Sequence, residues 1–147
     1  MKKGSDILEV IASRDKLHIR FSSFMKNIDE VCKRVTLFLE EKQENIAPHL
    51  FAINLVLREG LTNAVRHGNQ NDPKKLVDFQ LEIDRAKVIL FKIEDQGEGF
   101  DWKKQQNFDL PGEADHGRGI PIMKTYFTRY SYNKKGNLLY LEKTISP

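Results

Sequence analysis

The sequence predicts an α+β fold: a two-layer α/β sandwich with a mixed, mostly antiparallel sheet and about three helices on one face. Helix-like and strand-like segments follow one another in blocks, without the strict βαβ alternation that builds parallel sheets. The strand-like segments also come in pairs separated by short turns, as antiparallel hairpins do. Together these two patterns predict a largely antiparallel sheet covered by helices.

The composition is ordinary for a soluble globular protein. The chain has 147 residues, of which 31% are charged and 39% hydrophobic, with a net charge of +3. From this length we expect a single domain over residues 1–147. No apolar run approaches the roughly 20 residues that cross a bilayer, so we expect the protein in the cytoplasm. Basic residues are spread beside acidic ones, so we expect no direct nucleic-acid binding and no membrane binding. Cys32 is the only cysteine, which fits a reducing compartment.

The N-terminal segment predicts a hairpin followed by a helix. Residues 7–11 and 17–21 are short, rich in β-forming residues and separated by a polar turn. From about residue 24 to residue 44, apolar side chains then recur at helical spacing, which predicts an amphipathic helix. The residues with this spacing are Phe24, Ile28, Val31, Val35 and Leu39.

A second helix is predicted from Pro48 to His67. Proline is tolerated in a first helical turn, and Gly68 is a suitable residue just past the end. Between them, apolar residues again recur at helical spacing, which predicts a buried helix of about five turns. These residues are Leu50, Ile53, Leu57, Leu61 and Ala64.

Three residues within this helix are unusual. Glu59 and Asn63 are four positions apart, so their side chains project from one face. The alternative is that they are only the solvated edge of an amphipathic helix. Gly60 costs about 1 kcal/mol in a helix interior relative to alanine, and a glycine there indicates close approach by another backbone or a ligand.

The second half of the chain predicts two more hairpins, separated by a long loop and a short helix. The strands are expected at residues 77–83, 88–93, 130–132 and 138–141. Residues 97–117 show no usable periodicity and are rich in polar residues and glycine, so we expect a functional lid there. Gly119 opens a short helix that continues through Phe127.

A first glycine-rich motif follows the strand at 88–93, where Asp95 precedes Gly97 and Gly99. The glycines allow a ligand to approach the backbone closely. An ionised carboxylate only accepts hydrogen bonds, so Asp95 would pair with the exocyclic amine of adenine and repel the carbonyl oxygen of guanine. A plain surface turn is the alternative.

A second motif, Gly117-Arg118-Gly119, lies directly before the predicted short helix. Successive backbone N–H groups at such a position form a concave site for phosphate, which the helix dipole also favours. The alternative is a simple junction between loop and helix. Neither glycine motif completes a dinucleotide-binding fingerprint, and the sequence contains no G-x-x-x-x-G-K-[ST], which excludes a conventional P-loop.

In order, spacing and placement, these motifs resemble the GHKL ATPase superfamily, whose ATP-binding domain has the Bergerat fold. Residues 59–69 (EGLTNAVRHGN) look like its N box, residues 95–99 its first glycine box and residues 117–119 its second. The resemblance covers nearly the whole chain. It is closest to the single-domain RsbW-like anti-sigma-factor serine-protein kinases, which share the HGN end of the N box and the closing hairpin.

The resemblance implies a role for each motif residue. Glu59 would be the general base that deprotonates the attacking hydroxyl or water, and Asn63 would hold Mg²⁺. Asp95 would accept a hydrogen bond from the adenine amine. The other nucleotide-binding residues that it implies are Gly97, Gly99, Gly117, Arg118 and Gly119.

The resemblance also implies a function: an ATP- and Mg²⁺-dependent serine/threonine-protein kinase that phosphorylates a small STAS-type anti-sigma antagonist and sequesters a sigma factor. It further suggests a homodimer. The alternative is an ATP-binding regulatory module, anti-sigma-like, without efficient phosphoryl transfer. A third hypothesis is the ATP domain of a sensor kinase that serves a histidine, although the helix predicted at 24–44 contains no histidine.

Overall fold

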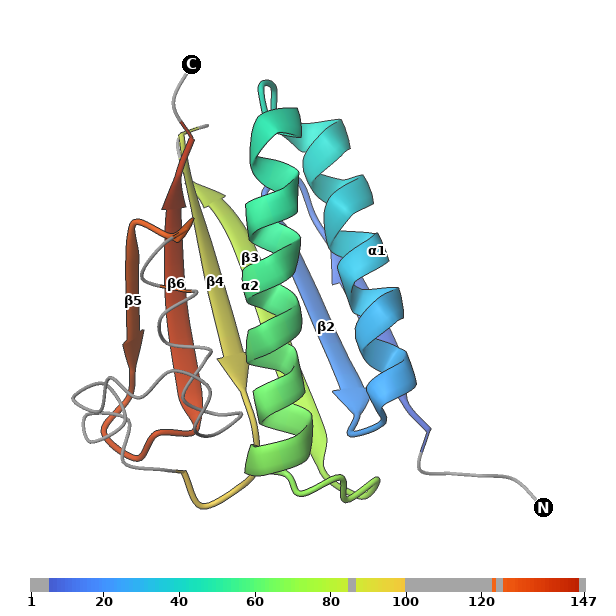
Figure 1. The fold of residues 1–147 in the computed structure, drawn as a ribbon. Helices are drawn as coiled ribbons and strands as arrows, with labels where there is room; N and C mark the ends of the chain where they lie inside the picture. The colour runs from blue at the N-terminus through green and yellow to red at the C-terminus, as the bar shows by residue number, and fades with distance from the viewer. Residues whose placement is uncertain (1–5, 85–86, 100–122, 124–125, 146–147) are drawn as a thin grey trace.

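The computed structural model describes residues 6–84, 87–99, 123 and 126–145 (Figure 1). These residues form one six-stranded sheet with the strand order β1-β2-β3-β4-β6-β5. The strands are β1 (Leu8–Ala12), β2 (Lys16–Ser22), β3 (Leu76–Asp84), β4 (Val88–Glu94), β5 (Arg129–Tyr132) and β6 (Leu138–Thr144). The helical segments are α1 (Met25–Lys42), the 3₁₀ turn η1 (Ala47–His49), α2 (Leu50–Asn63) and the π-helical turn η2 (Ala64–Gly68).

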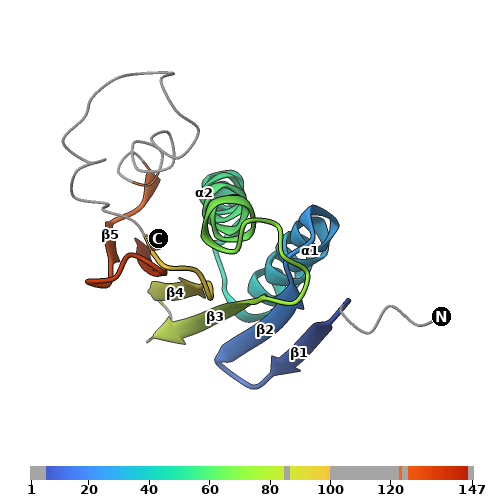
Figure 2. The same cartoon turned by 90° about the horizontal axis from the view of Figure 1, so that it is seen from below.

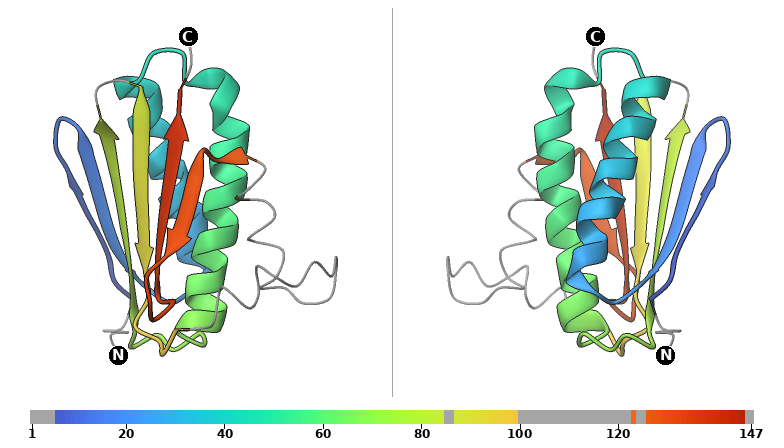
Figure 3. Two further views of the ribbon diagram at one scale, coloured as in Figure 1. Left: turned by 90° about the vertical axis from the view of Figure 1, so that its left-hand side faces the viewer. Right: turned by 90° about the vertical axis from the view of Figure 1, so that its right-hand side faces the viewer.

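The two long helices lie side by side on the same face of the sheet, as Figures 2 and 3 show. The predicted two-layer α+β sandwich is therefore confirmed. Every pairing between the described strands is antiparallel. The sheet of the described residues is therefore antiparallel throughout, whereas the sequence predicted a mixed, mostly antiparallel sheet. The third helix, predicted from Gly119 to Phe127, falls almost entirely outside the described residues. None of the described helices is both long and apolar enough to span a membrane.

The core forms because strand residues alternate between the two faces of the sheet. In β3 and β4 the buried positions face the helices, and the register places Phe79 opposite Ile93 and Leu81 opposite Phe91. The intervening residues face solvent and are polar or charged in β3. The strands predicted at 77–83, from period-two alternation, and at 88–93, from a continuous apolar run, are therefore confirmed as a hairpin.

Helix α2 lies close to the centre of the sheet because Gly60 has no side chain. A Cβ atom at this position would lie 3.0 Å from Ile93 Cδ1 and 3.2 Å from Leu139 Cδ2. The close approach predicted for Gly60 is confirmed, but the approaching groups are side chains of β4 and β6. The backbone or ligand that the sequence suggested is not what occupies this space.

The predicted helix from Pro48 to His67 is divided in the structure, with a 3₁₀ turn before α2 and a π-helical turn after it. The N–H of Asn69 donates to the carbonyl of Ala64 at 2.8 Å, a bond that spans five residues. The left-handed residues that follow are Gln70 and Asn71, with φ of 54° and 58°. Gly68 therefore does not end the helix by adopting a left-handed conformation. A glycine is required at this position because a side chain would overlap Asp95.

Candidate functional site

The predicted site residues that the structure describes lie toward one end of the sandwich, the lower end in Figure 1. There the C-terminal end of α2, the end of β4 and the beginning of β6 meet. Residues of the N box lie on the helical side, and Asp95 follows directly on β4. Two of the three motifs that were separated in the sequence are therefore neighbours in space.

Asp95 is the buried carboxylate of this region, with only 9% of its surface exposed. Its Oδ1 accepts a hydrogen bond from the N–H of Gly97 at 2.8 Å. The pKa of Asp95 is raised to about 6, mainly by burial. The hydrogen bond from the Gly97 N–H and the charges of two lysines lower the pKa by smaller amounts, and the charge of Glu94 raises it slightly. At neutral pH the group is still mainly ionised, so it can accept a hydrogen bond from a ligand amine.

Three glycines shape the space around Asp95. A Cβ on Gly68 would overlap the Asp95 carboxyl group, and a Cβ on Gly97 would overlap the carbonyl of Gly68. Gly99 has a φ of 86°, and a Cβ there would overlap the carbonyl of Lys135. Gly68 and Gly97 thus let the protein pack tightly around the carboxylate, and Gly99 lets the loop approach the backbone of Lys135.

Glu59 and Asn63 are both half-buried on α2, and Asn63 is the last residue before the π-helical turn. The charge of Glu59 acts on the hydroxyl of Tyr132, on β5. Burial raises the pKa of Tyr132, and the charges of Asp95 and then Glu59 raise it further. Both carboxylates therefore act on the Tyr132 hydroxyl.

Two asparagines fix the loop that carries Asp95. The side chain of Asn69, fully buried, accepts a hydrogen bond from the N–H of Gln96 at 2.7 Å. Asn137, directly before β6, accepts from the N–H of Asp95 through its main-chain carbonyl at 2.9 Å and donates from Nδ2 to the Asp95 carbonyl at 3.0 Å. The carboxylate is thus held from the helix side and from the β6 side.

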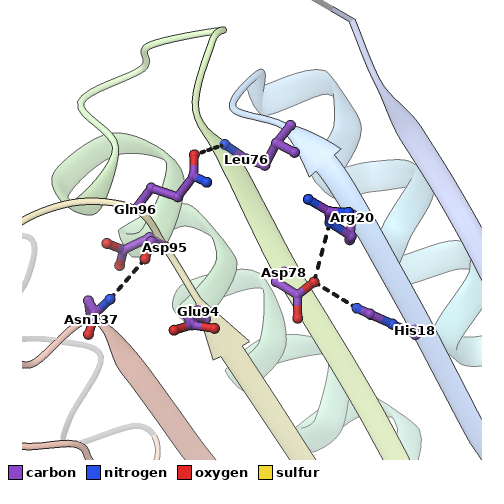
Figure 4. A pocket seen from close by; sticks show the side chains of 8 residues that line it. All are labelled: His18, Arg20, Leu76, Asp78, Glu94, Asp95, Gln96 and Asn137. Atoms are coloured by element: carbon purple, nitrogen blue, oxygen red, sulfur yellow. Dashed lines mark hydrogen bonds and ion pairs between the residues drawn. The ribbon is translucent and has the colours of Figure 1, made fainter.

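A hollow lies on the face of the sheet that the helices leave open (Figure 4). His18 Nε2 is 2.7 Å from Asp78 Oδ1, and Arg20 Nε is 3.7 Å from the same oxygen. Asp95 and Asn137 line its far end beside their mutual hydrogen bond. Asp95 is common to this hollow and to the predicted site, whereas Glu59 and Asn63 lie on α2, on the other side of the sheet.

The second glycine motif cannot be placed. Gly117, Arg118 and Gly119 lie outside the described residues, as does most of the lid predicted at 97–117. The described part of the candidate site therefore consists of the α2 end, the loop after β4 and the β5–β6 turn.

Comparison with known families agrees with this geometry. Residues 21–143 match the histidine kinase-like ATPase domain. Since this match covers most of the chain, the protein belongs to the family of histidine kinase-like ATPase domains. Membership implies ATP binding and a kinase-type fold. The GHKL resemblance read from the three motifs is confirmed.

Within this family, the curated relatives are anti-sigma F factors. The chain is 29% identical over 140 residues to the anti-sigma F factor of Geobacillus thermodenitrificans (strain NG80-2), covering 90% of this chain and 94% of that protein. It is 30% identical over 138 residues to the anti-sigma F factor of Geobacillus stearothermophilus, covering 88% and 92%. The predicted RsbW-like branch is therefore confirmed as well.

Solved structures show the same fold. The histidine kinase domain from the Erythrobacter litoralis EL346 blue-light activated histidine kinase matches with a TM-score of 0.50 and 13% identity, covering 85% of this chain. This chain spans 62% of that domain's length, and 31% of a longer chain of the same kinase. At this low identity the likeness concerns the fold alone.

Sequence reasoning missed the contributions of three residues. Gly68 was interpreted as a helix stop, while the roles of Asn69 and Asn137 were not considered. Asn69 lies 27 residues from Gln96 and Asn137 lies 42 residues from Asp95, so no local pattern connects them. The signals for Asn69 were its place at the HGN end of the N box and its polar character immediately after a buried helix.

Proposed function

We propose that this protein is an ATP-dependent serine/threonine-protein kinase that also acts as an anti-sigma regulatory factor. The observation that carries the proposal is the buried Asp95 carboxylate, held beside the end of the helix that bears Glu59 and Asn63. The regulatory part of the proposal is supported by the names of the curated relatives, which are anti-sigma F factors.

In this proposal Asp95 selects the nucleotide. Its ionised carboxylate accepts a hydrogen bond from the exocyclic amine of adenine. Guanine presents a carbonyl oxygen at the corresponding position, and two acceptors facing each other in a buried site leave both without a donor. The site should therefore discriminate strongly against GTP.

Glu59 serves as the general base for phosphoryl transfer. It removes the proton from a serine or threonine hydroxyl, whose oxygen forms the new bond to the γ-phosphorus while the bond to the bridging oxygen of ADP breaks. Asn63 offers a carboxamide oxygen, a donor type that suits the hard cation Mg²⁺. When bound, Mg²⁺ supplies neutralisation of the phosphate charge.

The proposed protein substrate is a small STAS-type anti-sigma antagonist, and the second partner is a sigma factor that this protein sequesters. Pairing with a second copy of the chain is part of the same proposal. The proposal does not include direct contact with nucleic acid or with a membrane. The hydroxyl acceptor distinguishes this activity from that of a histidine-directed kinase, which would form a phosphorus–nitrogen bond.

The test is a transfer assay with purified protein, γ-labelled ATP, Mg²⁺ and candidate STAS-type antagonists, with Glu59→Gln as the matched inactive variant. Acid-stable label on a serine or threonine of one antagonist, absent with Glu59→Gln, is the expected result. ATP-dependent binding to an antagonist without transfer would instead indicate a regulatory binding module. Acid-labile phosphohistidine would contradict the proposed substrate class.

A further inference from the structure

The buried side chain of Asn69 connects three separate segments of the protein. Its Nδ2 donates to Ser23 Oγ at 2.8 Å, just after β2, and to the carbonyl of Leu76 at 3.0 Å, at the start of β3. Its Oδ1 accepts from the N–H of Gln96 at 2.7 Å, in the loop after β4. Both amide hydrogens and the oxygen of the carboxamide are therefore used.

The position of Asn69 depends in turn on the π-helical end of the N-box helix. Its own N–H donates to the carbonyl of Ala64 at 2.8 Å, within the turn that follows Asn63. π-Helical turns occur often at functional sites, where they shift the residues that follow them. Through this bond, the helix that bears Glu59 and Asn63 is joined to the network that reaches Gln96.

The loop after β4 is held by Asn137 and by Asn69, which bind different groups of its backbone. Asn137 already binds both main-chain polar groups of Asp95, at 2.9 and 3.0 Å. The next peptide N–H, that of Gln96, is bound by Asn69, and the one after it, that of Gly97, donates to the Asp95 carboxylate at 2.8 Å. The Gly97 N–H belongs to the following peptide, so Asn69 acts on the carboxylate indirectly, through the backbone of Gln96.

We infer that Asn69 is a positioning residue of the nucleotide site, which fixes the turn from Asp95 to Gly97 so that the carboxylate is presented to adenine. This inference rests on the proposed function, because it assumes that adenine binds at Asp95. Asn69 itself is buried beneath the turn and acts only through Gln96 and Gly97.

Ser23 provides a matched control for this role. It is also buried, and its Oγ both accepts from Asn69 and donates to the carbonyl of Lys75 at 2.7 Å. Ser23→Ala removes two hydrogen bonds from the same network but leaves the bond between Asn69 and Gln96. A purely structural network predicts similar effects for Ser23→Ala and Asn69→Ala, whereas a positioning role for Asn69 predicts different ones.

The experiment compares wild type, Asn69→Ala and Ser23→Ala by amide hydrogen exchange without nucleotide and by calorimetric titration with Mg²⁺ATP. In Asn69→Ala, the amides of Gln96 and Gly97 should exchange at least about tenfold faster while those of central β3 stay protected. The dissociation constant for ATP should rise about tenfold or more. In Ser23→Ala, both quantities should stay within about twofold of wild type, although the protein unfolds at lower urea.

The outcomes separate this inference from the proposed function. A wild-type protein that binds no ATP would overturn the proposed function and the inference with it. A wild type that binds ATP, with Asn69→Ala that binds equally well and keeps its turn amides protected, would overturn the role of Asn69 alone. If Asn69→Ala does not fold, Asn69→Ser gives the same comparison, because serine keeps a polar group in the buried position but is too short to reach Gln96.

Discussion

Gly68 and Asp95 touch across the junction between the N-box helix and the loop after β4. A Cβ atom on Gly68 would overlap the carboxyl carbon and both oxygens of Asp95. The glycine of the N box and the aspartate of the first glycine box are therefore parts of one packed unit. Any side chain at position 68 must displace the carboxylate or the helix end.

Gly68→Ala should therefore lower both stability and ATP affinity. Overpacking of this kind costs about 1 to 3 kcal/mol of unfolding free energy, and the displaced Asp95 should weaken ATP binding by about tenfold or more. Urea unfolding and calorimetric titration measure the two effects. Ile53→Val is the matched control: it removes a buried methyl group further back on α2 at a cost of about 0.5 to 1.5 kcal/mol, and should leave ATP affinity unchanged. Equal ATP affinity in all three proteins would show that the contact between Gly68 and Asp95 does not affect ATP binding.

The burial of Asp95 makes its charge a cost to the folded state. Its pKa is raised to about 6 in the fold, above its unfolded value, so its contribution favours folding below the unfolded pKa and is lost as pH rises through 6. Asp95→Asn keeps an oxygen for the Gly97 N–H and carries no charge. This variant should gain about 1 to 2 kcal/mol of stability relative to wild type at pH 7.5, and nothing at pH 4. Urea unfolding at both pH values provides the measurement, and a pH-independent difference would contradict it.

The same ionisation should control adenine binding. Only the ionised carboxylate is a pure acceptor, and with a pKa of about 6 its ionised fraction falls from nearly all at pH 7.5 to about a tenth at pH 5. Adenosine affinity should therefore weaken roughly tenfold over this interval. Adenosine is the suitable probe because it lacks the phosphates that also titrate in ATP. A flat profile between pH 5 and pH 7.5 would show that Asp95 does not bind the base in its ionised form.

Glu59→Gln should separate chemistry from binding. A general base contributes about 10² to 10⁴-fold to the rate, whereas the isosteric amide leaves the nucleotide contacts at Asp95 intact. We expect the single-turnover rate of ATP conversion to ADP, with antagonist or water as acceptor, to fall by that factor. The dissociation constant for ATP should change less than about twofold. A variant that retains the wild-type rate would exclude Glu59 as the base.

Asn63→Ala should remove the metal dependence of nucleotide binding. If the Asn63 oxygen coordinates Mg²⁺, chelation of the metal should weaken ATP binding to wild type by about tenfold but change little in the variant. Titrations of both proteins with ATP, in Mg²⁺ and in EDTA, give the four dissociation constants needed. An Mg²⁺ effect of the same size in both proteins would place the metal on other residues.

Much of the fold follows from periodicity in the sequence. Both N-terminal strands, α1, the β3–β4 hairpin and the β5–β6 hairpin were predicted within a few residues of their observed bounds. These elements are amphipathic, so local spacing is enough to define them. The π-helical turn at Ala64–Gly68 was not predicted. Its residues look helical in isolation, and the tertiary contacts beside the turn are made by the side chain of Asn69 and by Gly68 against Asp95.

The site was only partly predictable for a similar reason. Glu59, Asn63, Asp95 and Gly97 were proposed as site residues from the sequence, because they belong to motifs whose spacing has a chemical reason. The roles of Asn69 and Asn137 depend on hydrogen bonds to a loop far along the chain. Such bonds leave no local pattern in one sequence.

The central claim is that Asp95 binds the adenine of ATP, and calorimetric titration of wild type and Asp95→Asn with Mg²⁺ATP and Mg²⁺GTP tests it most directly. We predict saturable binding of ATP to wild type, much weaker binding of GTP, and loss of ATP binding in Asp95→Asn although this variant is folded. Equal binding of ATP by both proteins, or no binding by wild type, would contradict the account.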